Sequence, residues 1–394
     1  MRKLLIIIVL IPLLGGFGWW YFRESTLPDY GPAYREYAYI TNGKSNTVSV
    51  IDLRTFELAK TIPVGTAPTG IAANGRKNEI YAVNTGSNNV SVIDAEKNAV
   101  VATIGVHGGP YFIDISEDGK RAYVANSGSA NVSVIDLEKR VVIGNLRVGA
   151  SPGLARVSPD GATVVVSNRG DNTVSVIDAK LLRVRATLPV CQHPEDIAIL
   201  PDSSKAFVAC SGSSQVASIA LASSKGGDAT VDRVLALLDV GRTPVSLALK
   251  PDGGELMVCD FDSDSISIIE TANDEVGSSA LVGQHPSHGL VTLDNSRLYV
   301  SNFGSDSVAV YDIDAGKRMP TMAVGSHPDG LALSQDQRYL LVLDTQAGDV
   351  TVIQKRTPRK LEPTEYSLLT MIPVGLQPNG IVVKSFIASP ASKK

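Results

Sequence analysis

The chain has 394 residues, of which 44% are hydrophobic, and its formal net charge is −4. This apolar content is too high and the net charge too small for an intrinsically disordered protein. Its 35 Gly and 21 Pro are too few for a collagen-like chain. With 40 acidic residues against 36 Lys and Arg, it has no basic excess for non-specific nucleic-acid binding.

The first predicted element is the one segment apolar enough to span a membrane, which excludes a polytopic membrane protein. Arg2 and Lys3 precede Leu4–Phe22, which has no charged side chain and as a helix would span about 28 Å, close to a bilayer core. The basic start places the N-terminus in the cytoplasm and the body outside. We therefore expect a signal anchor or signal peptide over residues 1–23 and a tether over 24–36. An uncleaved anchor is favoured, because cleavage would leave an aromatic residue at the start of the mature chain.

From residue 37 the chain repeats one unit. The tetrapeptide Tyr39–Asn42 has counterparts that start at residues 81, 123, 165, 207, 257, 299 and 341, so the spacing is 42 apart from one interval of 50. A run like Val48–Asp52 follows each copy, and then a Val-Gly-x-x-Pro element. Each unit therefore holds four short β-rich runs bounded by turn residues, the pattern of a β-propeller blade. We name these runs A (after the Pro), B (Tyr-x-x-Asn), C and D (before Val-Gly).

The two ends of the repeat region predict how the ring closes. The region begins with a B run near Tyr37 and ends with the A run Gln377–Lys384, which no B run follows. The C-terminal run can therefore complete the first blade. The sequence predicts an all-β, eight-bladed propeller over residues 37–386, a single monomeric ring of four-stranded antiparallel blades, with a tail over 387–394.

The tetrapeptide and its spacing resemble the YVTN family of β-propellers over about residues 37–386. That resemblance implies the fold, and it leaves the function open, because the family includes binding, surface and enzyme-associated proteins. Some relatives belong to periplasmic redox systems. The blade count also resembles the haem-carrying propeller of periplasmic nitrite reductase and its biosynthetic relatives.

Residues shared by most blades are expected to specify the blades. The Asn or Asp at the end of B and the Asp at the end of C are expected to cap the turns that follow them. The Gly of Val-Gly is expected to supply an unusual backbone angle.

Function is expected where the repeats differ, at the loops around the channel mouth. All five His residues fall in or beside D-to-A loops, and carboxylates lie next to several of them. The candidate ligand-binding residues are His107, His193, Glu195, Asp196, His285, His288, His327 and Asp329. Three interpretations stay open: a transition-metal or haem site with His285, His288 and His327 as ligands, a polar surface for a ligand or partner, and ordinary loop structure.

Two further pairs stand out. Asp114 and Arg156 occupy, in consecutive blades, a position that is small or apolar in most others, so we expect a structural ion pair between blades. Cys191 and Cys210 fall near one rim of the same blade and are a possible disulfide, which an exported compartment permits. The third Cys would then stay free or bond to another chain.

These observations favour a periplasmic or otherwise extracytoplasmic propeller that the N-terminal segment anchors to the inner membrane. We expect it to act as a protein-binding or accessory subunit, and a periplasmic redox system is a possible setting. Its partner would be a protein in or near the membrane, and neither a cofactor nor nucleic acid is required. No catalytic residue is assigned, because no hydrolase elbow, phosphate loop, dinucleotide fingerprint or His-Glu-x-x-His occurs. The alternative is a metal- or haem-dependent redox enzyme or cofactor carrier that uses the His-rich mouth.

Overall fold

The computed structural model describes residues 30–222, 230–356 and 365–389. The expected anchor over residues 1–23 lies outside this part of the chain, as do residues 24–29 of the tether. Among the described residues no helix is long and apolar enough to cross a membrane, and the one helical element there is a short 3-10 turn, η1 (Phe261–Ser263).

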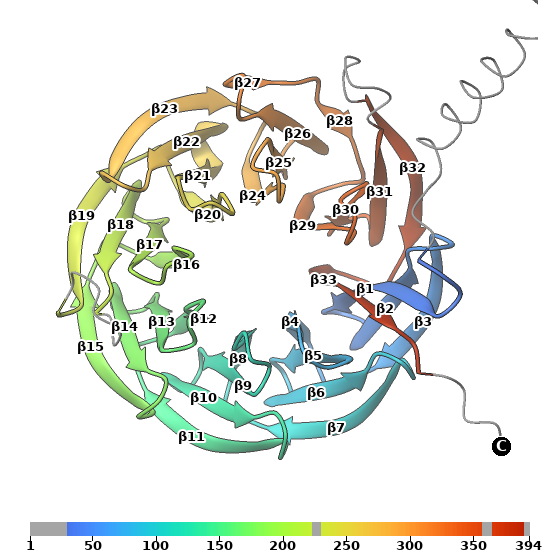
Figure 1. The fold of residues 1–394 in the computed structure, drawn as a ribbon, viewed down its shortest axis with the longest axis horizontal. Helices are drawn as coiled ribbons and strands as arrows, with labels where there is room; N and C mark the ends of the chain where they lie inside the picture. The colour runs from blue at the N-terminus through green and yellow to red at the C-terminus, as the bar shows by residue number, and fades with distance from the viewer. Residues whose placement is uncertain (1–29, 223–229, 357–364, 390–394) are drawn as a thin grey trace, which may run out of the picture. The chain divides into compact units, whose positions relative to one another are not determined.

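The strands form eight sheets arranged around a central axis (Figure 1). Given from the innermost strand outward, blades 1 to 4 consist of β33 (Pro378–Ile387), β1 (Tyr34–Asn42), β2 (Thr47–Asp52) and β3 (Glu57–Pro63); β4 (Pro68–Ala73), β5 (Glu79–Asn84), β6 (Asn89–Asp94) and β7 (Ala99–Gly105); β8 (Pro110–Ile115), β9 (Arg121–Asn126), β10 (Asn131–Asp136) and β11 (Val141–Arg147); and β12 (Pro152–Val157), β13 (Thr163–Asn168), β14 (Thr173–Asp178) and β15 (Arg183–Pro189). Blades 5 to 8 consist of β16 (Pro194–Ile199), β17 (Lys205–Cys210), β18 (Gln215–Ala220) and β19 (Arg233–Asp239); β20 (Pro244–Leu249), β21 (Glu255–Asp260), β22 (Ser265–Glu270) and β23 (Glu275–Leu281); β24 (Pro286–Val291), β25 (Arg297–Asn302), β26 (Ser307–Asp312), β27 (Lys317–Arg318) and β28 (Met322–Ala323); and β29 (Pro328–Leu333), β30 (Tyr339–Asp344), β31 (Asp349–Arg356) and β32 (Glu365–Pro373).

This arrangement confirms the predicted eight-bladed, antiparallel propeller and its closure. The C-terminal strand β33 is the innermost strand of the sheet that contains β1, β2 and β3, so the first and the last described strands share one blade (Figure 1). Blade 7 differs from the expectation of four strands, because its outer strand is split into β27 and β28. Pro320 lies between these segments and has no N–H to donate to the neighbouring strand.

The ring occupies Glu36–Phe386 as one compact unit. In the remaining unit, the Ala388 N–H donates to the Ala33 carbonyl over 2.8 Å.

The core lies between adjacent blades. The B strands are continuous buried runs because each of their faces packs on a neighbouring blade. Tyr123 of β9, for example, is 1% exposed and packs in one cluster with Ala155, Val164 and Ile177 of blade 4. The outer D strands instead alternate between exposed and half-buried residues, as β11 does.

The Gly of Val-Gly does not adopt an unusual backbone angle, so that expectation was wrong. The left-handed residue is the one directly before the Pro, as at Ala67 (φ 49°) and Ser151 (φ 48°). The Gly is needed for close approach, because a Cβ on Gly65 would lie 2.7 Å from the Cβ of Asn84. Sequence spacing could not distinguish these two reasons for a repeated Gly.

The expected capping roles are half confirmed. Asp94, at the end of a C strand, accepts the N–H groups of Glu96 (2.9 Å) and Lys97 (3.0 Å) and so caps its turn. The Asn at the end of B acts differently, because its amide reaches across to the C strand. Asn84 Nδ2 donates to Ser91 Oγ over 2.9 Å, which ties the two central strands together.

Cys191 and Cys210 form a disulfide, whereas Cys259 is free and buried. The disulfide stands at a defined place in the repeat. Cys191 occupies the Gly position of Val-Gly and Cys210 occupies the Asn position at the end of B, so in blade 5 a covalent bond replaces the close Gly–Asn contact.

Candidate functional site

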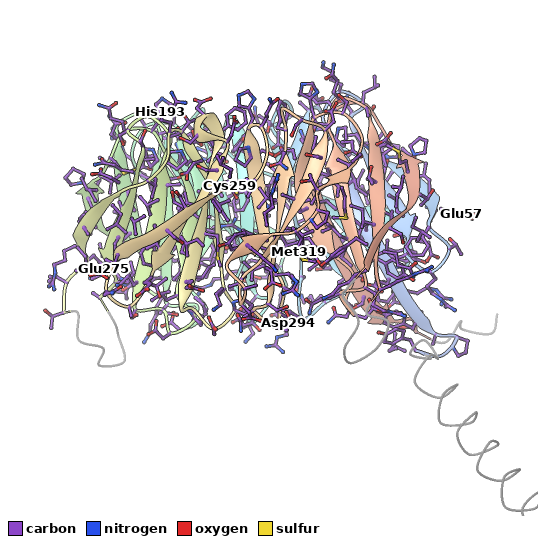
Figure 2. The ribbon with its side chains drawn as sticks, turned by 90° about the horizontal axis from the view of Figure 1, so that it is seen from above. Glu57, His193, Cys259, Glu275, Asp294 and Met319 are labelled. Carbon is purple, nitrogen blue, oxygen red and sulfur yellow. A yellow bond between two sulfur atoms is a disulfide. The ribbon has the colours of Figure 1, made fainter. Side chains whose placement is uncertain are left out.

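The candidate site is the ring face formed by the D-to-A and B-to-C loops, here called the mouth face. Figure 2 views the ring from the side and shows His193 at this face and Asp294, in an A-to-B turn, at the opposite one. The residue before each Pro is held on this face by the preceding blade. The N–H of His285 donates to Asp264 Oδ1 and that of His327 donates to Asp306 Oδ1, both over 2.9 Å. The repeat thus fixes the backbone from which these imidazoles project.

On blades 6 to 8 the mouth face carries alternating Phe and His rings, here called the aromatic–imidazole row. His285 stacks on Phe261 with centroids 4.6 Å apart and an interplanar angle of 6°. His327 meets Phe303 edge to face at 4.5 Å, and the two Phe rings are 6.2 Å apart. A Cβ on Gly304 would lie 2.7 Å from His285 Nδ1, so this Gly leaves room for the imidazole. The row is therefore held by ring packing.

A hollow of about 570 Å³ lies beside the end of the aromatic–imidazole row. Phe303 and His327 form one side of it, and Lys44 and Leu376 belong to its lining. Leu376 is 65% exposed, and Lys44 is the one charged side chain among the lining residues. The hollow thus combines apolar surface with a single cation.

On blades 3 to 5 the mouth face is charged instead. Arg169 Nε lies 2.7 Å from Glu195 Oε2, and the guanidinium lies 4.8 Å from the centre of the Tyr111 ring. His193 Nδ1 is 3.8 Å from the same Glu195 carboxylate. A Cβ on Gly153 would lie 2.5 Å from Arg169 Nε, so a Gly in the intervening strand lets this arginine cross. Arg169 therefore links three consecutive blades.

The expected ion pair between Asp114 and Arg156 is not among the ion pairs of the described residues, where Arg156 pairs with Asp196 instead. Arg156 Nη2 lies 3.6 Å from Asp196 Oδ1 and its guanidinium lies over the Phe112 ring. Asp114 accepts the Val157 N–H over 3.0 Å. Burial raises the pKa of the Asp114 carboxyl, and the positive charge of Arg156 lowers it. The sequence did not indicate Asp196 as the partner of Arg156, because its position in the repeat differs from that of Asp114.

The other candidate residues lie apart from these groups. His288 pairs with Ser301 across β24 and β25, and the carbonyl of Asp329 accepts Ser301 Oγ over 2.7 Å. His107 occupies the Gly position of its repeat, and its Nδ1 lies 3.0 Å from Asn131 Nδ2. In the described part of the chain no three His, Cys, Asp or Glu side chains are close enough to hold one metal ion. His285, His288 and His327 therefore do not converge there.

The donor set fits one kind of cofactor better than another. A metal centre made of protein ligands needs three or four converging donors, whereas a haem iron can be held by a single imidazole. His285 is exposed and His327 is half-buried at the mouth face, so each offers one nitrogen ligand beside aromatic rings. Phe261 and Phe303 occupy the same position of the repeat, but the sequence alone does not show their ring contacts with His.

Eight antiparallel blades, repeated Tyr-x-x-Asn tetrapeptides and closure by the C-terminal strand β33 define a YVTN-type β-propeller. The chain belongs to the YNCE-like beta-propeller family, whose model matches residues 19–156 and 153–365. No curated protein matches the sequence.

Solved structures with a similar fold include the dihydro-heme d1 dehydrogenase NirN in complex with DHE, with a TM-score of 0.69, 15% identity and coverage of 88% of this chain and 74% of that one. A hydrazine synthase from Kuenenia stuttgartiensis is similar with a TM-score of 0.57, 22% identity and coverage of 71% and 92%. A functionally unknown protein from Desulfotomaculum acetoxidans gives a TM-score of 0.58, 16% identity and coverage of 75% and 97%. At sequence identities this low, these similarities show a shared fold and nothing about function.

Proposed function

We propose that this chain is a non-catalytic β-propeller that binds a protein partner through its mouth face, as an accessory subunit of an extracytoplasmic redox system. The observation that carries the proposal is the aromatic–imidazole row with its adjoining hollow. Aromatic side chains beside a pocket are typical of the energetically important centre of a protein interface. The Arg169–Glu195 group on the other half of the mouth face would fix the orientation of the partner through charge.

The proposed compartment rests on two other features. A buried disulfide persists in an oxidising environment, and Cys191 and Cys210 are 5% and 0% exposed. The apolar segment Leu4–Phe22 would hold the ring to the inner membrane as a single anchor, with the partner in or near that membrane. An alkaline phosphatase fusion after residue 389 tests this location, since that enzyme is active only outside the cytoplasm. An inactive but stable fusion would contradict the proposed compartment.

Site-specific photo-crosslinking tests the partner surface. A photoreactive amino acid replaces Phe303 in the row or, as the control, Leu181, which is 56% exposed in a turn of the opposite face. We expect one defined adduct from the Phe303 position and none from the Leu181 position. The adduct should reappear when the identified partner and the ring are mixed in purified form. Equal adducts from both positions, or none, would contradict the proposal.

A haem- or metal-dependent redox enzyme or cofactor carrier is the second candidate. Its support is the similarity in fold to dihydro-heme d1 dehydrogenase NirN together with the exposed imidazoles of the row. His285 or His327 would supply one nitrogen ligand to the iron, Lys44 would offer a cation for an acidic group of the cofactor, and the haem would supply one-electron chemistry. Titration of the ring with haem separates the two candidates. A stoichiometric absorption band that is lost in His285→Ala or His327→Ala would favour the second one.

A further inference from the structure

The opposite face of the ring contains a second site, at the junction between blades 3 and 4. At this kind of junction the first residue of a B strand meets the C-to-D turn of the next blade. Among the described residues, two junctions are closed by an ion pair. Glu79 of blade 2 pairs with Arg140 of blade 3 over 2.7 Å, and Lys205 of blade 5 pairs with Asp274 of blade 6 over 2.8 Å.

The junction between blades 3 and 4 lacks this closure. Arg121 stands where Lys205 stands two blades later, and its Nη1 donates to the Ala179 carbonyl over 2.5 Å, just as Lys205 donates to the Thr271 carbonyl. The turn position that holds Asp274 in blade 6 holds Leu182 in blade 4, in the same left-handed conformation (φ 58° and 51°). Among the described residues Arg121 therefore has a carbonyl partner but no carboxylate.

The Tyr at the same junction shows a matching difference. Tyr39 donates its hydroxyl to Asn98 Oδ1 over 2.6 Å, and Tyr81 donates to Glu79 Oε2 over 2.5 Å. The hydroxyl of Tyr123 instead lies beside the guanidinium of Arg121, which lowers the pKa of Tyr123 while burial raises it. A guanidinium is only a donor, so within the described ranges the hydroxyl hydrogen has no acceptor of the kind found for Tyr39 and Tyr81.

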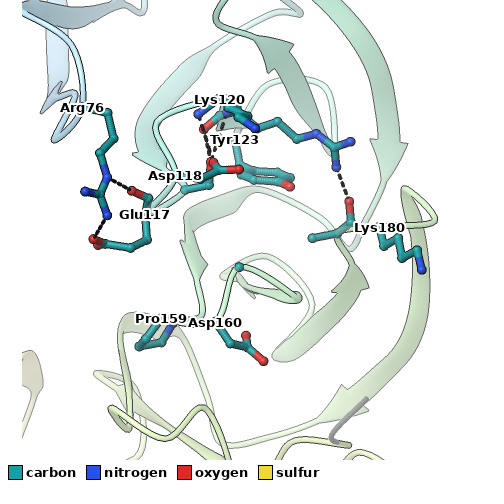
Figure 3. Close-up of a pocket in the computed structure, with 12 residues that line it drawn as sticks. Arg76, Glu117, Asp118, Lys120, Tyr123, Pro159, Asp160 and Lys180 are labelled. Atoms are coloured by element: carbon teal, nitrogen blue, oxygen red, sulfur yellow. Dashed lines mark hydrogen bonds and ion pairs between the residues drawn. The ribbon is translucent and has the colours of Figure 1, made fainter. Parts of the chain in front are cut away.

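A cavity of about 490 Å³ opens at this place (Figure 3), a size within the usual range for small-molecule sites. Lys120, Arg121 and Lys180 line it, and none of the three has a carboxylate partner in the part of the chain that the structure describes. Pro159 and the Tyr123 ring add apolar surface to the lining.

The acidic residues of the lining are already engaged. Glu117 pairs with Arg76 over 3.1 Å. Asp118 accepts Ser116 Oγ over 2.7 Å and the Lys120 N–H over 3.0 Å, and so belongs to its own turn. Asp160 does the same in blade 4, where it accepts Ser158 Oγ and the Ala162 N–H. Apart from the Arg76–Glu117 pair, the lining therefore holds three cations (Lys120, Arg121 and Lys180) against the two carboxylates Asp118 and Asp160, so its net charge is positive.

We propose that this cavity binds a small organic anion whose oxyanion, a carboxylate or a phosphate, takes the place that the Asp274 carboxylate occupies at the junction between blades 5 and 6. Arginine and lysine form strong charge-assisted hydrogen bonds to both groups, and the Tyr123 hydroxyl adds one more donor. The apolar lining would contact the organic part. The site lies on the face opposite the mouth, so the proposal does not depend on partner binding there.

Calorimetry on the full chain at constant ionic strength tests this, with inorganic phosphate and succinate as probes that distinguish the two anion chemistries. We expect saturable binding of at least one probe, and a loss of roughly tenfold or more in affinity in Arg121→Gln. Lys139→Gln is the control, since Lys139 is an exposed lysine of the same kind of turn in the preceding blade. Failure of both probes to bind, or equal effects of the two variants, would overturn the proposal.

Leu182→Asp tests the same idea by supplying the missing carboxylate within the chain. Asp tolerates the left-handed conformation better than Leu, and Asp274 shows that the ring accepts it there. We expect this variant to retain its fold and to lose anion binding, because Arg121 then has an internal partner. Unchanged anion affinity in a folded Leu182→Asp protein would contradict the proposed location.

Discussion

Asp260 should make the ring less stable at neutral pH than an Asn at the same position would. It stands at the end of a B strand, where five blades have an amide instead: Asn42, Asn84, Asn126, Asn168 and Asn302. Its side chain is fully buried and accepts Ser267 Oγ over 2.7 Å. Burial raises the pKa of the carboxyl from 3.8 to about 6, although hydrogen bonds from Ser267 and the Gly241 N–H lower it.

The raised pKa of Asp260 determines how the free energy of unfolding changes with pH. Because the folded-state pKa lies above the unfolded value, the protonated acid favours the folded state below about pH 4, and this advantage is lost as the pH rises to about 6. Asn is neutral throughout and reproduces the amide contact of the other blades. At about 1.4 kcal/mol per pKa unit, Asp260→Asn should raise the free energy of unfolding by about 3 kcal/mol at pH 8 and by close to zero at pH 4. For a ring of this size that corresponds to a rise in Tm of about 4 °C.

Urea unfolding followed by circular dichroism at pH 4, 6 and 8 provides the measurement. The matched control is Asp314→Asn, the same chemical change at an exposed turn, which should have little effect at any of these pH values. A gain for Asp260→Asn that is equal at pH 4 and pH 8 would refute the reasoning, because it would then not arise from ionisation. A gain in the free energy of unfolding below about 1 kcal/mol at pH 8 would show that the pKa of the buried Asp260 carboxyl is not raised.

Three further predictions concern the same repeat positions. Asp344→Asn should stabilise the ring in the same direction at neutral pH, because burial raises the pKa of that carboxyl too, and the same urea series measures it. Replacing Cys191 and Cys210 by Ser should lower the free energy of unfolding by about 3 kcal/mol, because the cross-link is lost. The double variant Cys191→Gly with Cys210→Asn, which carries the residues of other blades, should recover part of this loss. The denaturant midpoints of the two double variants provide the comparison. Gly65→Ala should cost a few kcal/mol through its clash with strand B, whereas Gly75→Ala, with open space around it, should leave Tm nearly unchanged.

Much of the fold could be predicted from the sequence because a propeller is built from local, repeated units. Each 42-residue period places strands and turns by nearest-neighbour rules, and counting periods gave the number of blades. The offset between the first B run and the last A run predicted the closing strand β33. The possible disulfide followed from the same alignment, since Cys191 and Cys210 share one blade and one rim.

Contacts between blades were decided by the tertiary structure. Arg169 reaches Glu195 only because Gly153 leaves space above the intervening strand, and no spacing rule contains that information. Arg121 lacks a carboxylate partner whereas Lys205 has Asp274, and this distinction becomes visible only when the tertiary structure sets each B strand against the C-to-D turn of the next blade, which carries Leu182 in one case and Asp274 in the other. The repeat period is a property of the chain, whereas these pairings arise from the rotation between blades, which sets side chains from different repeats against one another.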